Sequence, residues 1–278
     1  MDEPTAAADP LPRVVEHYER FDEAGRLTRG QGRLEGLRTR ALLQRWLPPA
    51  PAVVVDVGGA AGAYALPLAE QGHEVHLLDP VPRHLRQARE ASAAAASPLA
   101  SVTAADARSL PLTDRCADAV LLLGPLYHLT ARPDRLQALR EARRVLRPGG
   151  LVVAAAISRW GSASDAVHRA RLHDDFVAEE VLHDVATGEH RHVQHRRDWF
   201  TAAYLHRPED LAAEVADAGF SVDGPVAVEG LAAWAPDLDA VLDDPVARER
   251  LLALLAATER EPSLLGAGSH LLVAGHLT

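Results

Sequence analysis

The sequence predicts an α/β fold, in which a mostly parallel sheet is covered by helices on both faces. Short apolar segments alternate with amphipathic helical patterns along the middle of the chain, as they do in parallel sheets. The first apolar segment, residues 52–57, is followed directly by a glycine-rich turn and a helical pattern. The length of 278 residues suits one such domain of roughly 200 residues with additions to it.

The expected strands and helices follow one another regularly. The first helix ends at Gly72, because glycine just after a periodic segment is a typical helix terminator. Pro208 suits the first turn of a later helix. The further strands are expected at 74–79, 101–106, 117–124, 150–158, 220–228 and 270–277. The further helices are expected at 83–96, 132–146, 207–220 and 245–261.

The chain divides into a helical cap and one α/β domain. Residues 1–50 carry two helical patterns before the first strand, and we expect them to lie over one edge of the sheet as a cap. Residues 51–278 form the α/β domain. The alternation of predicted strands and helices is interrupted at about 159–207, a segment rich in His, Arg and Asp, and again at about 229–266. Both segments are interpreted as insertions, and the first as a lid over a substrate.

The composition excludes several chemistries. The 29 residues counted as Lys or Arg are all Arg, so a lysine Schiff base, a pyridoxal phosphate anchor and a P-loop lysine have no amine to use. The one cysteine, Cys116, cannot alone form a disulfide, a thiolate zinc site or an iron–sulfur cluster.

Charge and hydropathy indicate the kind of partner. The net charge is -10 with Arg spread along the chain, whereas nucleic-acid binding needs a basic stripe; we expect a small-molecule partner and no nucleic acid. The mean hydropathy is -0.09, and no segment approaches the roughly 20 apolar residues of a membrane span, so no membrane is expected. The acidic, proline-rich start differs from a secretory signal, which predicts a cytoplasmic protein.

A glycine-rich turn, DVGGAAG, runs from Asp56 to Gly62. Glycine there lets the backbone approach a ligand without a Cβ clash, and the helix N-terminus that follows offers free N–H groups. A dinucleotide loop of the form G-x-G-x-x-G starting at Gly58 needs glycine at 60 and 63, and both are Ala. An NAD site is therefore disfavoured. The turn fits Asp-x-Gly-x-Gly-x-Gly better, with Ala60 in place of the central glycine.

Acidic residues end the next two strands. Asp79 lies 79 - 62 = 17 residues beyond Gly62, where an acid accepts hydrogen bonds from ribose hydroxyls. The alternative is that Asp79 caps the next helix. Asp106 ends the following strand. The carboxyl ends of strands are where open α/β sheets bind ligands, so both acids are expected beside the glycine-rich turn.

Four segments carry a family resemblance: VVVDVGGAAGAYALPLAEQG, HLLDPVPRHLRQAR, AADARSLPLTDRCADAVLLLGPLYHL and REARRVLRPGGLVVAAAIS. In this order they resemble the successive motifs of class I S-adenosylmethionine-dependent methyltransferases, over residues 52–158. The stretch FTAAYLHRPEDLAAEVADAGF is similar to an actinobacterial small-molecule branch of that family.

The resemblance implies a Rossmann-like sheet of seven strands in the order 3-2-1-4-5-7-6, with strand 7 antiparallel, and S-adenosyl-L-methionine as cofactor with S-adenosyl-L-homocysteine as product. It places the turn against the methionine part, Asp79 on the ribose, Asp106 with the Ala107 backbone on the adenine, and the strand-four end near the sulfonium. The expected cofactor-binding residues are Tyr18, Arg38, Asp56, Gly58, Gly59, Ala60, Gly62, Asp79, Pro80, Asp106, Ala107, Arg108, Leu123 and Gly124.

Ala60 departs from the family pattern. A methyl group at this close-packed turn either shifts the loop or, if the residue has a positive φ, introduces strain of about 1–3 kcal/mol. Either outcome predicts a modest cofactor affinity.

Two residues of the cap need separate arguments. Arg38, by similarity to related caps, is expected to reach the cofactor carboxylate in a bidentate pair; the alternative is a solvated helix arginine. Tyr18 recurs with His17 and Phe21 at helical spacing, which also fits an apolar face that packs on the sheet.

Candidate catalytic residues fall in two places. Transfer to an alcohol, phenol or protonated amine needs a group that takes a proton, and histidine suits this best. Tyr127 and His128 follow the fourth strand. The first insertion holds His190, His192, His195 and His206, with Trp199 and Tyr204 among them. His128 fits equally well as a residue that fixes its loop. The string HRHVQH has no matching carboxylate spacing, so no metal is expected.

The sequence therefore predicts a methyltransferase that acts on N or O of a small molecule, such as an intermediate of natural product biosynthesis, as a monomer or homodimer. One alternative is an RNA or protein methyltransferase on the same fold. The other is a non-catalytic protein that binds S-adenosylmethionine, which the departure at Ala60 leaves open.

Overall fold

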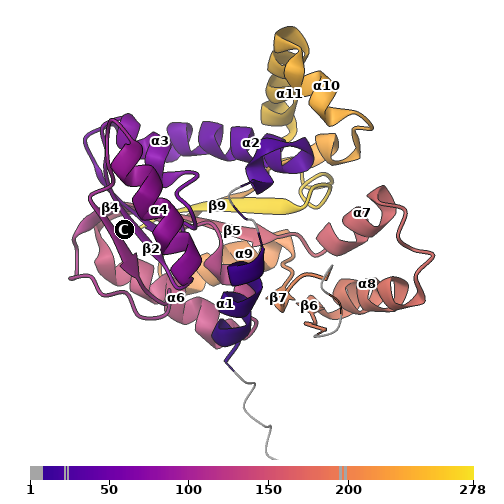
Figure 1. The fold of residues 1–278 in the computed structure, drawn as a ribbon, viewed down its shortest axis with the longest axis horizontal. Coiled ribbons are helices and arrows are strands. Elements are labelled where there is room, and N and C mark those ends of the chain that lie inside the picture. Colours follow the sequence, from indigo (N-terminus) through magenta and orange to yellow (C-terminus); the bar gives the residue numbers. More distant parts are fainter. Residues whose placement is uncertain (1–8, 22, 24, 194–195, 197–198) are drawn as a thin grey trace, which may run out of the picture.

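A seven-stranded sheet forms the centre of the computed structural model (Figure 1), which describes residues 9–21, 23, 25–193, 196 and 199–278. Its order is β3-β2-β1-β4-β5-β9-β8, and β9 runs antiparallel to both neighbours. The predicted order 3-2-1-4-5-7-6 is confirmed, since β8 and β9 are the sixth and seventh expected strands. The strands are β1 Val53–Val57, β2 Glu74–Asp79, β3 Ser101–Ala104, β4 Ala117–Leu122, β5 Leu146–Ile157, β8 Ser221–Ala227 and β9 His270–His276.

Both faces of the sheet are covered, because successive side chains of each strand point to opposite sides. Val54 and Leu121 pack under one layer of helices, and Val55 and Leu122 under the other. The first layer consists of α2 Gly30–Trp46, α3 Ala65–Glu70 and α4 Pro82–Ala94. The second consists of α5 Pro125–His128, α6 Arg132–Val145 and α9 Pro208–Asp217.

The expected N-terminal cap is two separate structures. Helix α1 Leu11–Arg20 lies beside α4, and the short turn η1 Arg26–Thr28 leads into α2. The sequence predicts that this segment lies over one edge of the sheet. Helix α2 lies on one face of the sheet instead, because Leu42 and Leu43 are buried against the strands. Leu34 at its other end packs against the second insertion.

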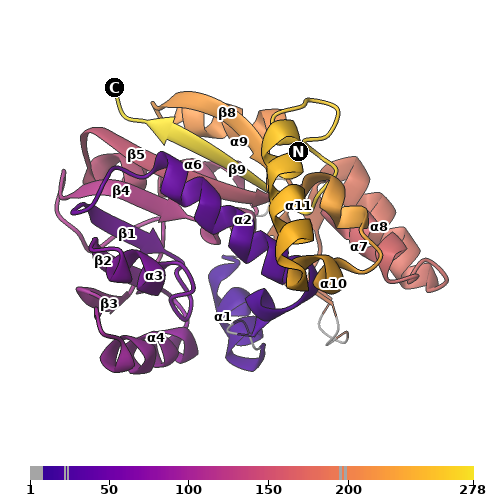
Figure 2. The same ribbon diagram turned by 90° about the horizontal axis from the view of Figure 1, so that it is seen from above.

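Both insertions are largely helical. The first contains α7 Gly161–His168, α8 Asp175–Thr187 and the two-residue strands β6 Glu189–His190 and β7 Ala203–Tyr204, which pair with each other. Figure 1 shows this group beside one end of the sheet, and it has a small apolar cluster of its own. The second contains η2 Gly230–Trp234, α10 Leu238–Asp243 and α11 Pro245–Thr258, which lie by the start of α2 (Figure 2). Within the described part of the chain, no helix has the length and apolar character needed to cross a membrane.

A buried ion-pair network joins the first insertion to the sheet domain. Arg135 of α6 donates to Glu214 of α9 at 2.8–3.1 Å and to two loop carbonyls. His206 lies 3.3 Å from the same carboxylate and has no exposed surface. Burial opposes ionisation of Glu214, but His206 and Arg135 outweigh it and lower its pKa to about 2.

Replacement of Glu214 by Gln should cost about 3–5 kcal/mol of unfolding free energy at pH 7, because it leaves Arg135 buried without its counter-charge. The folded-state pKa of Glu214 is lowered from 4.5, so its contribution is present above pH 4.5 and is lost as the pH falls toward 2. Urea unfolding at several pH values measures this. The exposed pair of Arg132 and Asp217 offers the control Asp217→Asn, which should change stability by less than about 1 kcal/mol. Equal effects of the two variants would contradict the account.

Candidate active site

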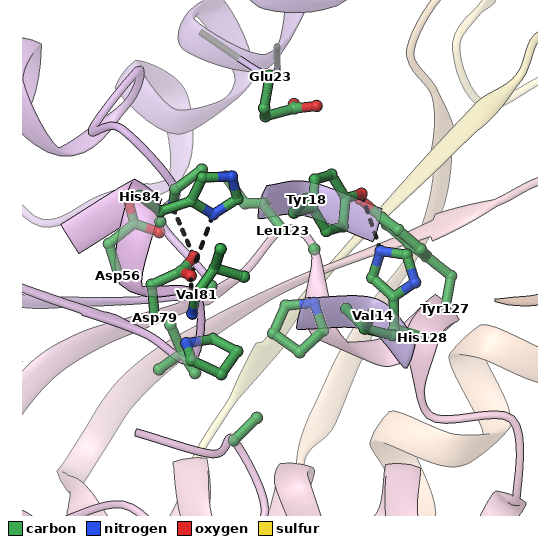
Figure 3. A pocket seen from close by; sticks show the side chains of 18 of the residues that line it. Val14, Tyr18, Glu23, Asp56, Asp79, Val81, His84, Leu123, Tyr127 and His128 are labelled. Carbon is green, nitrogen blue, oxygen red and sulfur yellow. Dashed lines mark hydrogen bonds and ion pairs between the residues drawn. The ribbon is translucent and has the colours of Figure 1, made fainter. Parts of the chain in front are cut away.

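A cavity opens at the carboxyl ends of β1, β2 and β4, where parallel strands bring their last residues to one edge. Asp56, Asp79 and Gly124 line it together with the glycine-rich turn, and Tyr18 closes it from α1 (Figure 3). Its volume is about 130 Å³. We call it the cofactor cavity below.

The glycine-rich turn has the backbone geometry that the sequence predicts. Gly58 and Gly62 have φ of 72° and 93°, values that favour glycine. A Cβ atom on Gly59 would lie 2.7 Å from the Asp56 carboxylate, so the side chain of any other residue would displace that acid. Ala60 has φ of 48°; of the two expected outcomes, the structure has the strained one, at about 1–2 kcal/mol.

Asp79 fastens this turn to the next helix. Its Oδ2 accepts a hydrogen bond from the backbone N–H of Ala60 at 2.9 Å, and its Oδ1 accepts one from Val81 at 2.8 Å. His84 lies 3.1 Å from Oδ1 (Figure 3). The carboxylate accepts from the start of α4, which confirms the helix-end alternative. It also lines the cavity, and its contact with a ribose stays a prediction.

Asp56 is a buried acid with an unsatisfied oxygen. Asp56 is 1% exposed, and its Oδ2 has no hydrogen-bond partner within the described part of the chain. Burial, and then the charge of Asp79, raises the pKa of Asp56 to about 7. A ligand with a positive charge would stabilise the ionised carboxylate, so this end of the cavity suits a cationic group.

Most of the expected cofactor-binding residues line the cavity. Those that do are Tyr18, Asp56, Gly58, Gly59, Ala60, Asp79, Pro80, Asp106, Ala107, Leu123 and Gly124. Gly62 turns the chain behind the wall. Arg108 lies outside the lining and donates to both oxygens of Asp106 at 2.6–3.1 Å, so it orients that acid.

Arg38 does not reach the cavity. Its side chain is buried, donates to Glu259 at 2.6 Å and to the Val228 carbonyl at 3.3 Å. The expected pair with a cofactor carboxylate is therefore wrong, and so is the alternative of a solvated arginine. The pairing partner comes from the end of the second insertion, far along the chain, and no local pattern around Arg38 signals it.

A charged cluster that the sequence analysis missed lies beside the cavity. Arg26 pairs with both oxygens of Glu35 and with Glu23, and all three line the cavity. His270 lies 2.6 Å from Glu229 and 3.7 Å from Glu35. Burial opposes the charge of His270, but Glu35 and Glu229 outweigh it and raise its pKa to about 9. The cluster therefore holds two cations against three carboxylates.

His128 is fixed by Tyr18. The phenol oxygen and Nε2 of His128 lie 2.9 Å apart (Figure 3), and burial lowers the pKa of His128 to about 3. A neutral imidazole with its Nε2 already engaged is a weak base, so the geometry favours the role of fixing its loop. Tyr127 is adjacent, and burial raises the pKa of its phenol, which keeps that group neutral.

A second cavity of about 430 Å³ adjoins the first. Four residues line both cavities: Tyr18, Glu23, Arg26 and Tyr127. The remaining wall comes largely from the first insertion and is rich in aromatic rings, among them His190, Trp199 and Phe200. Of the expected catalytic residues, His206 lies outside both cavities in its pair with Glu214, and His195 lies outside the described residues.

Comparison with known proteins agrees with this geometry. Residues 55–154 match the family model described as a methyltransferase domain. Over 106 residues the chain is 38% identical to an uncharacterized methyltransferase of Mycobacterium tuberculosis. These residues make up 38% of this chain and 40% of that protein. The chain thus matches about two fifths of the length of its curated relatives.

Two solved structures share the fold over nearly the whole chain. The CcbJ methyltransferase of Streptomyces caelestis has a TM-score of 0.59 and 15% identity, over 97% of this chain and 98% of that one. The [4+2]-cyclase SpnF has a TM-score of 0.55 and 17% identity, over 96% and 93%. The chain has the Rossmann-like fold of these class I methyltransferase structures, and residues 55–154 match the methyltransferase-domain model.

The residues present fit S-adenosylmethionine, the cofactor of this fold class. The unsatisfied oxygen of Asp56 suits a ligand that carries ammonium and sulfonium charges. Asp79 and Asp106 end neighbouring strands beside it. The cavity's volume of about 130 Å³ is below the roughly 300 Å³ at which ligand sites begin. Helix α1 forms part of its wall and packs there through Val14 and Tyr18 against Val81.

The affinity for S-adenosylhomocysteine, which keeps the ammonium group, should rise on the order of tenfold between about pH 5.5 and 7. The free protein holds a proton on Asp56 up to a pKa of about 7, and a cationic ligand binds best once that proton has left. Calorimetric titration at each pH measures this, with Asp56→Asn expected to bind more weakly and with no such rise. A wild-type affinity that stays constant would remove Asp56 from the binding site.

Proposed function

We propose that the protein transfers a methyl group from S-adenosylmethionine to a nitrogen or oxygen atom of a small molecule held in the second cavity. One observation carries this proposal: the two cavities share a wall made of Tyr18, Glu23, Arg26 and Tyr127. A methyl donor in the cofactor cavity and an acceptor in the second cavity would both contact these four residues, so the two reactants would lie next to each other. The methyltransferase domain over residues 55–154 supports the donor side.

The protein's own part in the reaction is alignment and exclusion of water. When bound, S-adenosylmethionine supplies a methyl group on sulfur, a leaving group that needs no further activation. Asp56 would face a positive charge of the donor, and Asp79 would keep the turn in place. Tyr18 and His128, whose side chains lie 2.9 Å apart, line the cofactor cavity. When two reactants are already held in line, the reaction step no longer has to overcome the loss of translational and rotational entropy. A closed site also excludes competing water.

The second cavity supports a small acceptor. Its volume of about 430 Å³ lies within the 300–1,000 Å³ typical of sites for small organic molecules. Its aromatic wall can cover a flat ring or contact a cation. The net charge of -10 opposes binding to RNA. An intermediate of natural product biosynthesis fits these features.

Purified protein should convert S-adenosylmethionine to S-adenosylhomocysteine when offered small phenols, alcohols and amines, with the acceptor gaining one methyl group by mass spectrometry. The variant Asp79→Ala should lose this turnover, because the turn and the strand end both depend on that carboxylate. A reaction of the acceptor without consumption of the donor would contradict the proposal. That outcome would favour chemistry of another kind on the same fold, as in the cyclase neighbour.

A further inference from the structure

A carboxylate and a histidine form a buried pair in the first insertion. Nδ1 of His190 lies 2.7 Å from Oδ2 of Asp184, and the two residues are 7% and 0% exposed. An ionised carboxylate only accepts hydrogen bonds, so Nδ1 carries the proton and Nε2 keeps its lone pair. That Nε2 is buried and has no hydrogen-bond partner among the residues that the structure describes.

The local fold brings the two residues together. Asp184 lies in the last turn of α8, and Gly188, with φ of 83°, ends that helix. The left-handed turn sends the chain back along α8, which places His190 of β6 against Asp184. A residue with a side chain at 188 would clash with the Arg159 guanidinium, 2.5 Å from the position of its Cβ. The pair therefore depends on this glycine.

The imidazole plane is held on a second side. Trp199 stacks on His190 with ring centroids 4.9 Å apart and planes 22° apart. The indole N–H of Trp199 donates to the Arg191 carbonyl at 3.1 Å, which fixes that ring in turn. Carboxylate and indole together determine the direction of the free Nε2.

His190 belongs to the wall of the second cavity, which Tyr127 also lines. A row of aromatic rings runs from His190 to Tyr127. The ring centroid of Phe200 lies 6.1 Å from that of His190 and 5.6 Å from that of His128. The centroid of Tyr127 lies 4.6 Å from that of His128. A molecule in this cavity would lie between His190 and the wall shared with the cofactor cavity. Because Nε2 is buried in the ligand-free protein, a small movement of the cavity wall has to open it to that molecule.

We propose that His190 is the general base of the reaction, that Asp184 positions it, and that the acceptor atom is the oxygen of a phenolic or alcoholic hydroxyl. The proposal rests on the proposed function and specifies its acceptor. A hydroxyl becomes strongly acidic as its oxygen gains a methyl group, so it needs a group that takes its proton. A neutral amine needs none before the methyl group arrives.

The atoms balance in one step. A bond forms between the hydroxyl oxygen and the methyl carbon while the carbon–sulfur bond breaks, and the electron pair of that bond stays on sulfur. The hydroxyl proton passes to Nε2 of His190. The resulting imidazolium is stabilised by the Asp184 carboxylate 2.7 Å away and returns the proton to solvent after the product leaves.

Among the other described histidines, His84 also has its Nδ1 beside a carboxylate, 3.1 Å from Asp79, and an unpaired Nε2, but it lines the cofactor cavity and not the second one. The remaining described histidines near the cavities lack this combination. His128 has its Nε2 engaged by Tyr18. His206 is paired with Glu214 and faces neither cavity. His270 carries a proton between its carboxylates. His17 lines the second cavity, but burial and His192 lower its pKa, and no carboxylate of the described residues pairs with it.

Charged groups from several elements surround the pair. The Arg171 guanidinium lies 5.9 Å from the centroid of the Trp199 ring, and Arg191 is paired with Glu180. The described charged or titratable residues that share the cavity wall with His190 are His17, Tyr18, Glu23, Arg26, Tyr127, Asp165, Arg169, Arg171 and His270. The wall thus carries residues of both charge signs. The Asp184 carboxylate is in direct contact with the imidazole, at 2.7 Å.

The test compares matched variants on the best hydroxyl acceptor. His190→Gln should lower kcat/KM by about 100-fold to 10,000-fold with unchanged affinity for S-adenosylhomocysteine. Asp184→Asn should lower it less and shift the rising limb of the pH profile to lower pH, because the imidazolium loses its counter-charge. The exposed residues His168 and Glu179 supply the controls His168→Gln and Glu179→Gln, which should match the wild type.

A second measurement needs no turnover. Nitrogen-15 spectra of the ligand-free protein should show His190 as the tautomer protonated at Nδ1, and Asp184→Asn should change that pattern while thermal melting shows an intact fold. Wild-type rates in His190→Gln, or a reversed tautomer, would overturn the assignment of the base. Efficient transfer to amines only would overturn the hydroxyl acceptor. A failure to transfer methyl groups to any acceptor, with normal cofactor binding and the expected tautomer, would instead count against the proposed function.

Discussion

The carboxylate of Asp79 is the contact on which the cofactor cavity depends. One oxygen accepts from Ala60 in the glycine-rich turn and the other from Val81 at the start of α4, so a single buried side chain sets the distance between turn and helix. It also holds Ala60 at a positive φ, a conformation that alanine adopts only under constraint. Its negative charge contributes to the raised pKa of Asp56. The turn, the strand ends and the preference for a cation thus follow from one group.

Arginine pairs attach the surrounding segments to this centre. Arg26 ties the chain between α1 and α2 to Glu35, Arg38 ties α2 to Glu259, and Arg135 ties α6 to α9. Because a guanidinium donates in a planar fork, it can join two or three acceptors where an ammonium could not do so in one plane. This chain, which contains no lysine, uses this geometry in each of these three contacts.

The central sheet could be predicted because each of its strands and helices is visible in its own stretch of sequence, as an apolar run or a helical period of apolar residues. The positions of Asp56 and Asp79 followed for the same reason, since parallel strands bring their ends together whatever else surrounds them. The pairing of Arg38 could not be predicted, because its partner is 221 residues away. The Asp184 and His190 pair escaped notice because it depends on the left-handed turn at Gly188, and the engagement of His128 because its partner lies on α1.

The central claim is that the cavity beside Asp79 binds S-adenosylmethionine, and calorimetric titration with S-adenosylhomocysteine tests it most directly. We expect saturable, micromolar binding by the wild type, no binding of NAD under the same conditions, and loss of about 1.5–3 kcal/mol of affinity in Asp79→Ala, since hydrogen bonds to a charged group are removed. Thermal melting of the variant separates this loss from unfolding. Equal affinity in wild type and variant, or a preference for NAD, would contradict the account.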